Sequence, residues 1–185
     1  MSIIGDGLNK AVEKAFTRTP PRSAGAQMRY LVKQLKGTKN VAQMLRVSQR
    51  TVERYVKDQI KKPRADLAGR LDREVKGRWQ PQVRAKARQT AATTKGIVID
   101  TRARFGYTAP IGSTDQDRIR HLTVALPPEY AGRLFDAQEA GASDSELEQI
   151  AAEALKDVYF QDRGRRAGSL EDVRFTDIEH LEFGL

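Results

Sequence analysis

The stretch from Thr38 to Lys57 constrains the fold of this chain more than any other part of its sequence. Apolar residues recur at helical spacing on both sides of a short break, which is typical of two short helices that cross closely. Ala42 is small where the second helix would press on the first, and Ser48 stands where it would cap the second helix. The pattern predicts a helix-turn-helix. The residues expected in its shared core are Val41, Leu45, Val47, Val52 and Tyr55.

The turn of this predicted motif departs from the usual pattern at one position. The residue that follows Leu45 is most often glycine, which accepts a positive φ, whereas here it is Arg46. We therefore expect the arginine either to lengthen the turn or to carry about 1 kcal/mol of backbone strain.

The charges of the chain are divided unevenly between its two halves. The whole chain has 33 Lys and Arg against 24 Asp and Glu, a net charge of +9. Residues 1–95 hold 23 of the basic and 7 of the acidic residues, a net +16, whereas residues 96–185 hold 10 and 17, a net −7. A basic half next to a predicted helix-turn-helix indicates binding to a polyanion, and nucleic acid in particular.

The outward side chains of the second helix are the candidates for reading DNA. Residues near the start of such a helix reach base edges in the major groove, where arginine can bind guanine and glutamine adenine. The alternative to a DNA-binding helix-turn-helix is an ordinary helical hairpin with charged outer faces. The residues expected to contact bases are Gln49, Arg50, Thr51 and Arg54. Those expected to contact phosphates are Lys39, Arg46, Lys57, Lys61 and Lys62.

The pattern along the chain predicts an α+β fold in two domains. Residues 1–76 have helical periodicity and are assigned to a DNA-binding domain with the helix-turn-helix at about residues 38–57. In residues 77–95 the periodicity fades among basic and small residues and Pro81 breaks the segment, which indicates a basic, partly helical linker placed to contact phosphates. Residues 96–185 are expected to form a small α+β domain.

The second domain is expected to begin with a β-hairpin. One strand opens at residues 96–99 and extends to Phe105 or Tyr107, and residues 119–126 form the other. Between them, residues 109–117 are rich in turn-forming residues.

Two helices are expected after the hairpin. Pro128 stands where a helix can begin, and Gly141 where it ends. Ser143 and Glu146 have the spacing of a capping box for the next helix. Residues 164–185 are charged and less regular, and are expected to form a tail.

Several kinds of chemistry have no pattern in this sequence. With no cysteine, disulfides are impossible and a zinc site would need unusual ligands. No Walker-type phosphate loop or Gly-x-Ser-x-Gly elbow occurs. His121 and His180 lie far apart in the sequence, and Asp115 and Asp117 suit a solvated loop better than a cation site, which needs several convergent oxygens. We therefore expect no enzymatic activity and no metal or cofactor of the chain's own.

Membrane association is not expected. No apolar run approaches the ~20 residues that a membrane span requires, and the start lacks the apolar stretch of a signal peptide. A bacterial-type cytoplasm, with the protein on the nucleoid, is the expected location.

Three segments of the chain together resemble one protein family. The opening residues 1–10, the segment Arg18–Arg22 and residues 38–57 are similar to the Streptomyces-type telomere terminal proteins, most distinctively within residues 1–60. The resemblance extends over essentially the whole chain. It implies a protein that is covalently attached to the 5′ ends of linear chromosomes and plasmids, and that primes DNA synthesis when the recessed telomere end is filled in.

The partners are also implied by the resemblance. They are telomeric DNA with a single-stranded or folded 3′ overhang, a DNA polymerase that supplies the catalytic centre with its Mg²⁺, and a telomere-associated protein. Self-association is left open.

A protein primer needs an accessible hydroxyl. Its oxygen must enter a two-metal polymerase site and attack an α-phosphate in line, so a slim projection suits it. The 109–117 loop offers Thr108, Ser113 and Thr114, with Tyr107 at its edge. Thr114 is nearest the expected tip, and its setting resembles the linking site of the family, for which dCMP is the expected first nucleotide. Thr114 is therefore the first candidate and Ser113 the alternative, although an ordinary hairpin turn needs the same residue types.

Two other functions fit the same motif. A transcriptional or plasmid-maintenance regulator would bind a palindromic duplex as a dimer. An architectural nucleoid protein would bind without sequence preference and with a steep dependence on salt.

Overall fold

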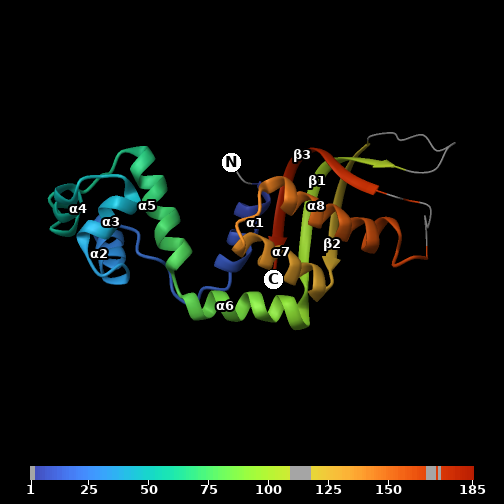
Figure 1. Cartoon of the computed structure of the whole chain (residues 1–185), viewed down its shortest axis with the longest axis horizontal. Coiled ribbons are helices and arrows are strands. Elements are labelled where there is room, and N and C mark those ends of the chain that lie inside the picture. The colour runs from blue at the N-terminus through green and yellow to red at the C-terminus, as the bar shows by residue number, and fades with distance from the viewer. Residues whose placement is uncertain (1–2, 109–117, 166–169, 171) are drawn as a thin grey trace. The chain divides into compact units, whose positions relative to one another are not determined.

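The computed structural model describes residues 3–108, 118–165, 170 and 172–185, and these residues adopt a mixed α+β fold (Figure 1). They form eight α-helices and one three-stranded antiparallel sheet, as the α+β prediction expects. The chain divides into two compact units. We call residues 17–81 the helical unit, and residues 1–16 with 82–185 the sheet unit.

The boundaries of these units differ from the expected domains of residues 1–76 and 96–185. Helix α1 (Ile3–Glu13) does not join the helices that follow it, because its apolar side chains are buried in the core of the sheet unit. Ile4, Leu8 and Val12 are fully buried there, and α1 contacts β3 and α8. The helical periodicity of residues 1–76 includes α1, but it does not identify the surface that covers the helix.

The helical unit contains helices α2 (Ala24–Gln34), α3 (Thr38–Leu45), α4 (Gln49–Val56) and α5 (Ala65–Arg78). Ser23 caps α2 by accepting a hydrogen bond from the Ala26 backbone N–H at 3.3 Å. The four helices share one apolar core, whose buried members are Ala24, Met28, Leu31, Val41, Ala42, Leu45, Val52, Tyr55, Leu67, Leu71 and Val75.

The expected linker at residues 77–95 is largely helical, and one of its arginines, Arg84, is buried. It contains the end of α5, helix α6 (Pro81–Thr90) and a π-helical turn, η1 (Ala91–Lys95). Arg84 is buried and donates to Asn9 Oδ1 at 3.1 Å, and its guanidinium lies 5.9 Å from the Phe16 ring centroid. Burial, reinforced by the charge of Arg88, lowers the pKa of Arg84. The expectation of a linker contacting phosphates is therefore wrong for Arg84.

The sheet has the order β2-β1-β3. Strands β1 (Ile97–Thr108) and β2 (Arg118–Leu126) form the predicted hairpin, with Ile97 opposite Leu126 and Phe105 opposite Arg118. Along β2 the side chains at 122, 124 and 126 are buried and those at 119, 121, 123 and 125 are exposed, so one face of the sheet is covered and the other meets solvent.

The C-terminal segment contains a strand that the sequence did not predict. β3 (Asp172–Gly184) pairs antiparallel with β1 along the edge that β2 leaves open, with Val98 opposite Gly184. The expectation of an irregular tail is therefore wrong. The pairing shifts register at two places, between Arg102 and Ala103 and between Arg104 and Phe105, so a strict alternation of apolar and polar residues is lost.

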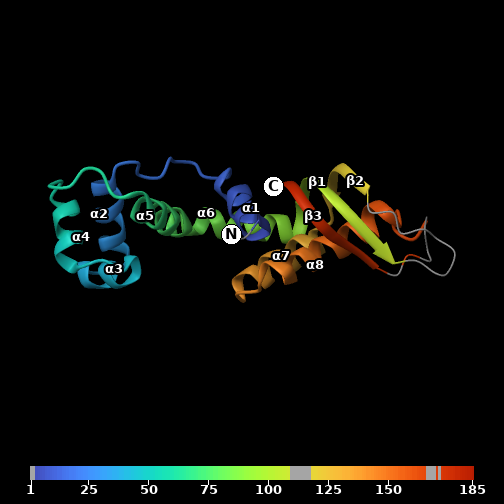
Figure 2. The same ribbon diagram turned by 90° about the horizontal axis from the view of Figure 1, so that it is seen from above.

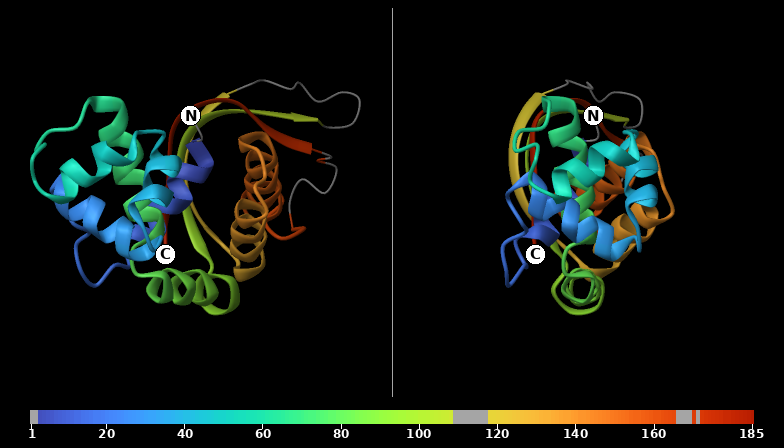
Figure 3. Two further views of the ribbon diagram at one scale, coloured as in Figure 1. Left: turned by 60° about the vertical axis from the view of Figure 1, so that its left-hand side comes forward. Right: turned by 90° about the vertical axis from the view of Figure 1, so that its left-hand side faces the viewer.

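Helices α7 (Pro128–Glu139) and α8 (Asp144–Leu155) begin where the sequence predicts them, and a second π-helical turn, η2 (Lys156–Phe160), follows α8. Pro128 occupies the first turn of α7, and Ser143 and Glu146 form the expected capping box of α8. Figures 1 and 2 show α7 and α8 across one face of the sheet, and Figure 3 shows that this is its concave side. Among the described residues, no helix is both long and apolar enough to cross a membrane.

Candidate nucleic-acid interface

Helices α3 and α4 are joined by a tight turn of three residues, Arg46 to Ser48. Arg46 has the left-handed backbone conformation, with φ 53° and ψ 48°, and its N–H is directed to the carbonyls of Ala42 and Gln43. The Val47 N–H donates to the Ala42 carbonyl at 2.9 Å. Arg46 therefore occupies the place that glycine usually takes without lengthening the turn, and it carries the strain that the sequence suggested.

The two helices are held together by the predicted core residues. Val41 and Leu45 of α3 and Val52 of α4 are fully buried, and Tyr55 is 4% exposed. Ala42 is also buried, and Val47 packs against the same cluster while half-buried. Burial of one side of each helix leaves the opposite side of α4 to face solvent.

Ser48 is the N-cap of α4, as predicted. Its Oγ accepts a hydrogen bond from the Thr51 backbone N–H at 3.1 Å and lies 2.8 Å from the Thr51 hydroxyl. The half-buried Thr51 therefore contributes its hydroxyl to the start of the helix. It is less available to a ligand than the exposed side chains beside it.

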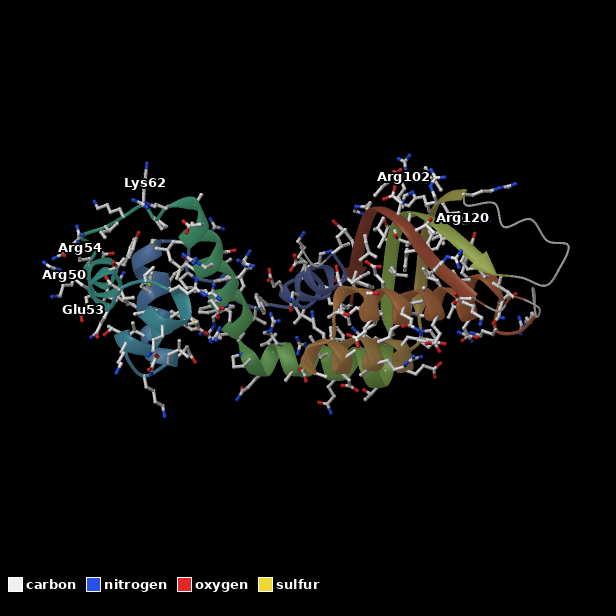
Figure 4. The ribbon with its side chains drawn as sticks, turned by 45° about the horizontal axis from the view of Figure 1, so that its top comes forward. Arg50, Glu53, Arg54, Lys62, Arg102 and Arg120 are labelled. Carbon is white, nitrogen blue, oxygen red and sulfur yellow. The ribbon has the colours of Figure 1, made fainter. Side chains whose placement is uncertain are left out.

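Arg50 and Arg54 are exposed on α4, one helical turn apart (Figure 4). Neither forms an ion pair with any described residue. Two guanidinium groups at this spacing present donors along one side of the helix, which suits acceptors such as guanine O6 and N7 or phosphate oxygens.

Gln49 is exposed, but its amide nitrogen is already engaged. Its Nε2 donates to Thr38 Oγ1 at 3.1 Å and to Glu53 Oε1 at 3.0 Å. The expected two-bond contact with adenine needs an amide N–H as well as the amide oxygen, so it would require one of these hydrogen bonds to break.

The cations expected to contact phosphates are all exposed. Lys39 is on α3, Arg46 in the turn and Lys57 at the end of α4, and the segment before α5 carries Lys61 and Lys62. None of the five forms an ion pair within the described part of the chain.

The helical unit as a whole has an excess of positive charge, and little of its negative charge is paired with the exposed cations of α3 and α4. The unit contains 17 Lys and Arg and 5 Asp and Glu, a net charge of +12. Four of its five carboxylates are paired with bases outside α3 and α4, so they do not neutralise those cations. The pairs are Asp58 with Arg29 at 2.8 Å, Asp66 with Arg70 at 3.2 Å, Asp72 with Lys76 at 2.9 Å, and Glu74 with Arg78.

The two hydroxyl candidates for covalent attachment, Thr114 and Ser113, lie outside the described residues. The strands that flank them are described, and two of their arginines were not singled out by the sequence. Arg102 of β1 pairs with Glu179 at 2.9 Å, and the guanidinium of Arg120 lies 5.6 Å from the Phe160 ring centroid (Figure 4).

The sheet brings together the two histidines, which are far apart in the sequence. His121 Nε2 lies 3.3 Å and His180 Nε2 3.4 Å from Asp100 Oδ1. The hydrogen bond from Thr123, and the two histidines, lower the pKa of Asp100. These side chains belong to β2, β3 and β1, so only strand pairing reveals the cluster. Within the described ranges, no group of three or more His, Cys, Asp or Glu is arranged to hold a metal ion.

Comparisons with protein-family models, with curated proteins and with solved structures return no match to this chain.

Proposed function

We propose that this protein binds double-stranded DNA through α3 and α4, as a helix-turn-helix. The observation that supports the proposal is the exposed side of α4, which carries Arg50 and Arg54 without ion pairs while its other side is buried. The major groove is about 12 Å wide and admits one α-helix. Arg50 and Arg54 would then contact bases.

The other cations of the helical unit would position α4 on the duplex. Contacts to phosphates fix the register of a protein on DNA and release counterions, but they carry no sequence information. The residues proposed for this role are Lys39, Arg46, Lys57, Lys61 and Lys62.

We further propose that the protein acts as a terminal protein that primes DNA synthesis at the ends of linear replicons. The support for this role is the resemblance of its sequence to the Streptomyces-type family. Thr114, or alternatively Ser113, would supply the priming hydroxyl. Its oxygen would attack the α-phosphate of dCTP, so that a phosphoester bond forms, the α–β anhydride bond breaks and pyrophosphate leaves. The hydroxyl proton would pass to a base or water in the polymerase, which supplies the Mg²⁺ ions.

Duplex binding is tested by electrophoretic mobility shift of the full chain on duplex and single-stranded oligonucleotides. The double variant Arg50→Ala/Arg54→Ala is expected to lose at least about tenfold in duplex affinity, because it removes two donors from α4. The variant Arg64→Ala/Arg73→Ala removes the same charge from the segment and helix that follow, and is expected to lose less. Equal losses would indicate binding by net charge alone, as in an architectural protein.

Priming is tested by incubating the protein with labelled dCTP, telomeric template and an extract that is active on a known terminal protein. Label that survives boiling and detergent and maps to Thr114 by mass spectrometry is the expected result. Thr114→Ala should abolish it and Ser113→Ala should preserve it. Label on another hydroxyl would overturn the choice of residue, and absence of label would favour a regulator, whose duplex site should be palindromic.

A further inference from the structure

Glu53 differs from every other carboxylate of the helical unit. The other four are ion-paired, whereas Glu53 forms no ion pair with a described residue. Arg50 and Lys57 stand three and four positions from it along the chain, where a surface pair commonly forms. A carboxylate thus remains uncompensated on the helix that carries the basic side chains (Figure 4).

The carboxylate of Glu53 fixes the side chain of Gln49. Its Oε1 accepts one N–H of the Gln49 amide at 3.0 Å, and the hydroxyl of Thr38 accepts from the same nitrogen at 3.1 Å. An amide nitrogen has two hydrogens, so both are used. The polar side-chain atoms that these two hydrogen bonds leave unused are acceptors, namely Oε1 of Gln49 and Oε2 of Glu53.

The side of α4 away from the core is therefore divided into donors and acceptors, with Glu53 half-buried and Gln49, Arg50 and Arg54 exposed. Arg50 and Arg54 offer only donors, and the Gln49–Glu53 pair offers acceptors. An acidic side chain is repelled by phosphates, so Glu53 lowers affinity for the DNA backbone. In a major groove its acceptor matches an exposed amino group, and carboxylates accept from N4 of cytosine.

We propose that Glu53 is a specificity-determining residue, which selects cytosine at one position of the duplex by accepting a hydrogen bond from its amino group. The inference rests on the proposed binding of duplex DNA by α4. Gln49 is the positioning neighbour: its amide nitrogen is held by Glu53 and Thr38, and its oxygen would accept from the adjacent base pair.

The test is selection of the full-length protein on duplexes with a random centre, followed by sequencing of the retained DNA. The wild-type protein is expected to enrich cytosine at one position by about tenfold over other bases. Glu53→Gln retains an oxygen that can accept from Gln49 but loses the charge, and Glu53→Ala loses both. Both variants are expected to lose the cytosine preference while binding unselected duplex more tightly.

Asp66→Asn is the matched control, because it removes one negative charge from α5 of the same unit. It is expected to raise affinity for all duplexes and to leave the base preference unchanged. Circular dichroism of each variant checks that its helices are intact.

Each outcome supports or overturns the inference. A cytosine preference that persists in Glu53→Ala, or wild-type enrichment without cytosine, would overturn it while duplex binding stands. Failure of the wild-type protein to retain any duplex would overturn the proposed function, and the role of Glu53 with it.

Discussion

Arg46 combines a strained backbone with an exposed charge. Its φ of 53° belongs to the left-handed region, which costs an L-residue roughly 1–2 kcal/mol. Glycine would relieve that cost, so the arginine is not explained by the stability of the turn. Strained residues that a fold tolerates often have a functional role. Contact with a phosphate would provide one here.

Replacement of Arg46 should separate stability from binding. Arg46→Gly is expected to raise the free energy of unfolding by about 0.5–1 kcal/mol, since relief of strain exceeds the added flexibility of the unfolded chain. It should also weaken duplex binding. Arg46→Ala is the control, because it removes the charge and keeps the strained Cβ. Urea unfolding followed by circular dichroism provides the measurement, and a less stable glycine variant than alanine variant would contradict the argument.

Arg84, unlike the exposed Arg46, is buried and stabilises the core of its unit. It is 8% exposed, bonded to Asn9 and placed over the ring of Phe16, so its long side chain and its charge both serve the core of the sheet unit. From net charge alone, Arg84 would be expected to contact DNA phosphates.

Arg84→Ala is expected to destabilise the sheet unit by about 2 kcal/mol, because it leaves Asn9 without its charged donor and removes packing from Phe16. Lys86→Ala, at an exposed position of the same helix, should change stability by less than about 0.5 kcal/mol. Denaturant unfolding of both variants compares them. Duplex affinity should be unchanged in Arg84→Ala if the fold is retained. A large loss of affinity in a folded variant would indicate that Arg84 contacts DNA.

At the scale of elements, serine side chains cap helices in both units, α4 in the helical unit and α8 in the sheet unit among them. Ser48 caps α4, and Ser143 caps α8 in a reciprocal pair with Glu146, whose Oε2 accepts from the Ser143 N–H at 2.6 Å. The local hydrogen bonds resemble one another, whereas the helices they start have different surroundings. The two caps therefore offer a test of the proposal that α4 binds DNA.

Ser48→Ala and Ser143→Ala should each cost about 1 kcal/mol of stability, because each leaves a backbone N–H at a helix start without its acceptor. Only Ser48→Ala is expected to weaken duplex binding, since it loosens the first turn of α4. Thermal unfolding and mobility shift measure the two effects. Equal loss of affinity in both variants would mean that binding follows overall stability rather than α4.

At the scale of the whole molecule, positive charge is concentrated in one unit. The helical unit has a net charge of +12, whereas the sheet unit has 16 basic and 19 acidic residues, a net −3. The two halves of the sequence have net charges of the same signs as the two units. The boundary differs, because α1 and most of α6 belong to the sheet unit. Attraction of DNA is thus expected from the helical unit.

The dependence of duplex affinity on salt concentration should show that the helical unit, and not the sheet unit, contacts phosphates. Lys61→Ala/Lys62→Ala is expected to reduce the slope of log affinity against log salt by up to about 2, since each lost phosphate contact removes about 0.9. Lys86→Ala/Lys95→Ala removes two exposed charges from the sheet unit and should leave the slope nearly unchanged. Affinities measured across a range of salt concentrations decide between these results. The same slope change in both variants would indicate that charge acts without regard to position.

Local patterns predicted much of the fold and of the site. The shared core of α3 and α4, the cap at Ser48, the β1–β2 hairpin and the capping box at Ser143 follow from residue size, spacing and side-chain hydrogen bonding. These features depend on residues close together in the chain. The exposed Arg50 and Arg54 were predicted for the same reason.

The tertiary structure decided what depends on distant residues. The stripe of α1 needs a covering surface, Arg84 has its partner 75 positions away, and β3 gains its hydrogen bonds only beside β1. The sequence determined where helices and strands can begin and which side of α4 is apolar, because propensity, caps and periodicity act over a few residues. Which unit contains α1, the burial of Arg84 and which carboxylate stays unpaired were settled only by packing between segments far apart in the chain.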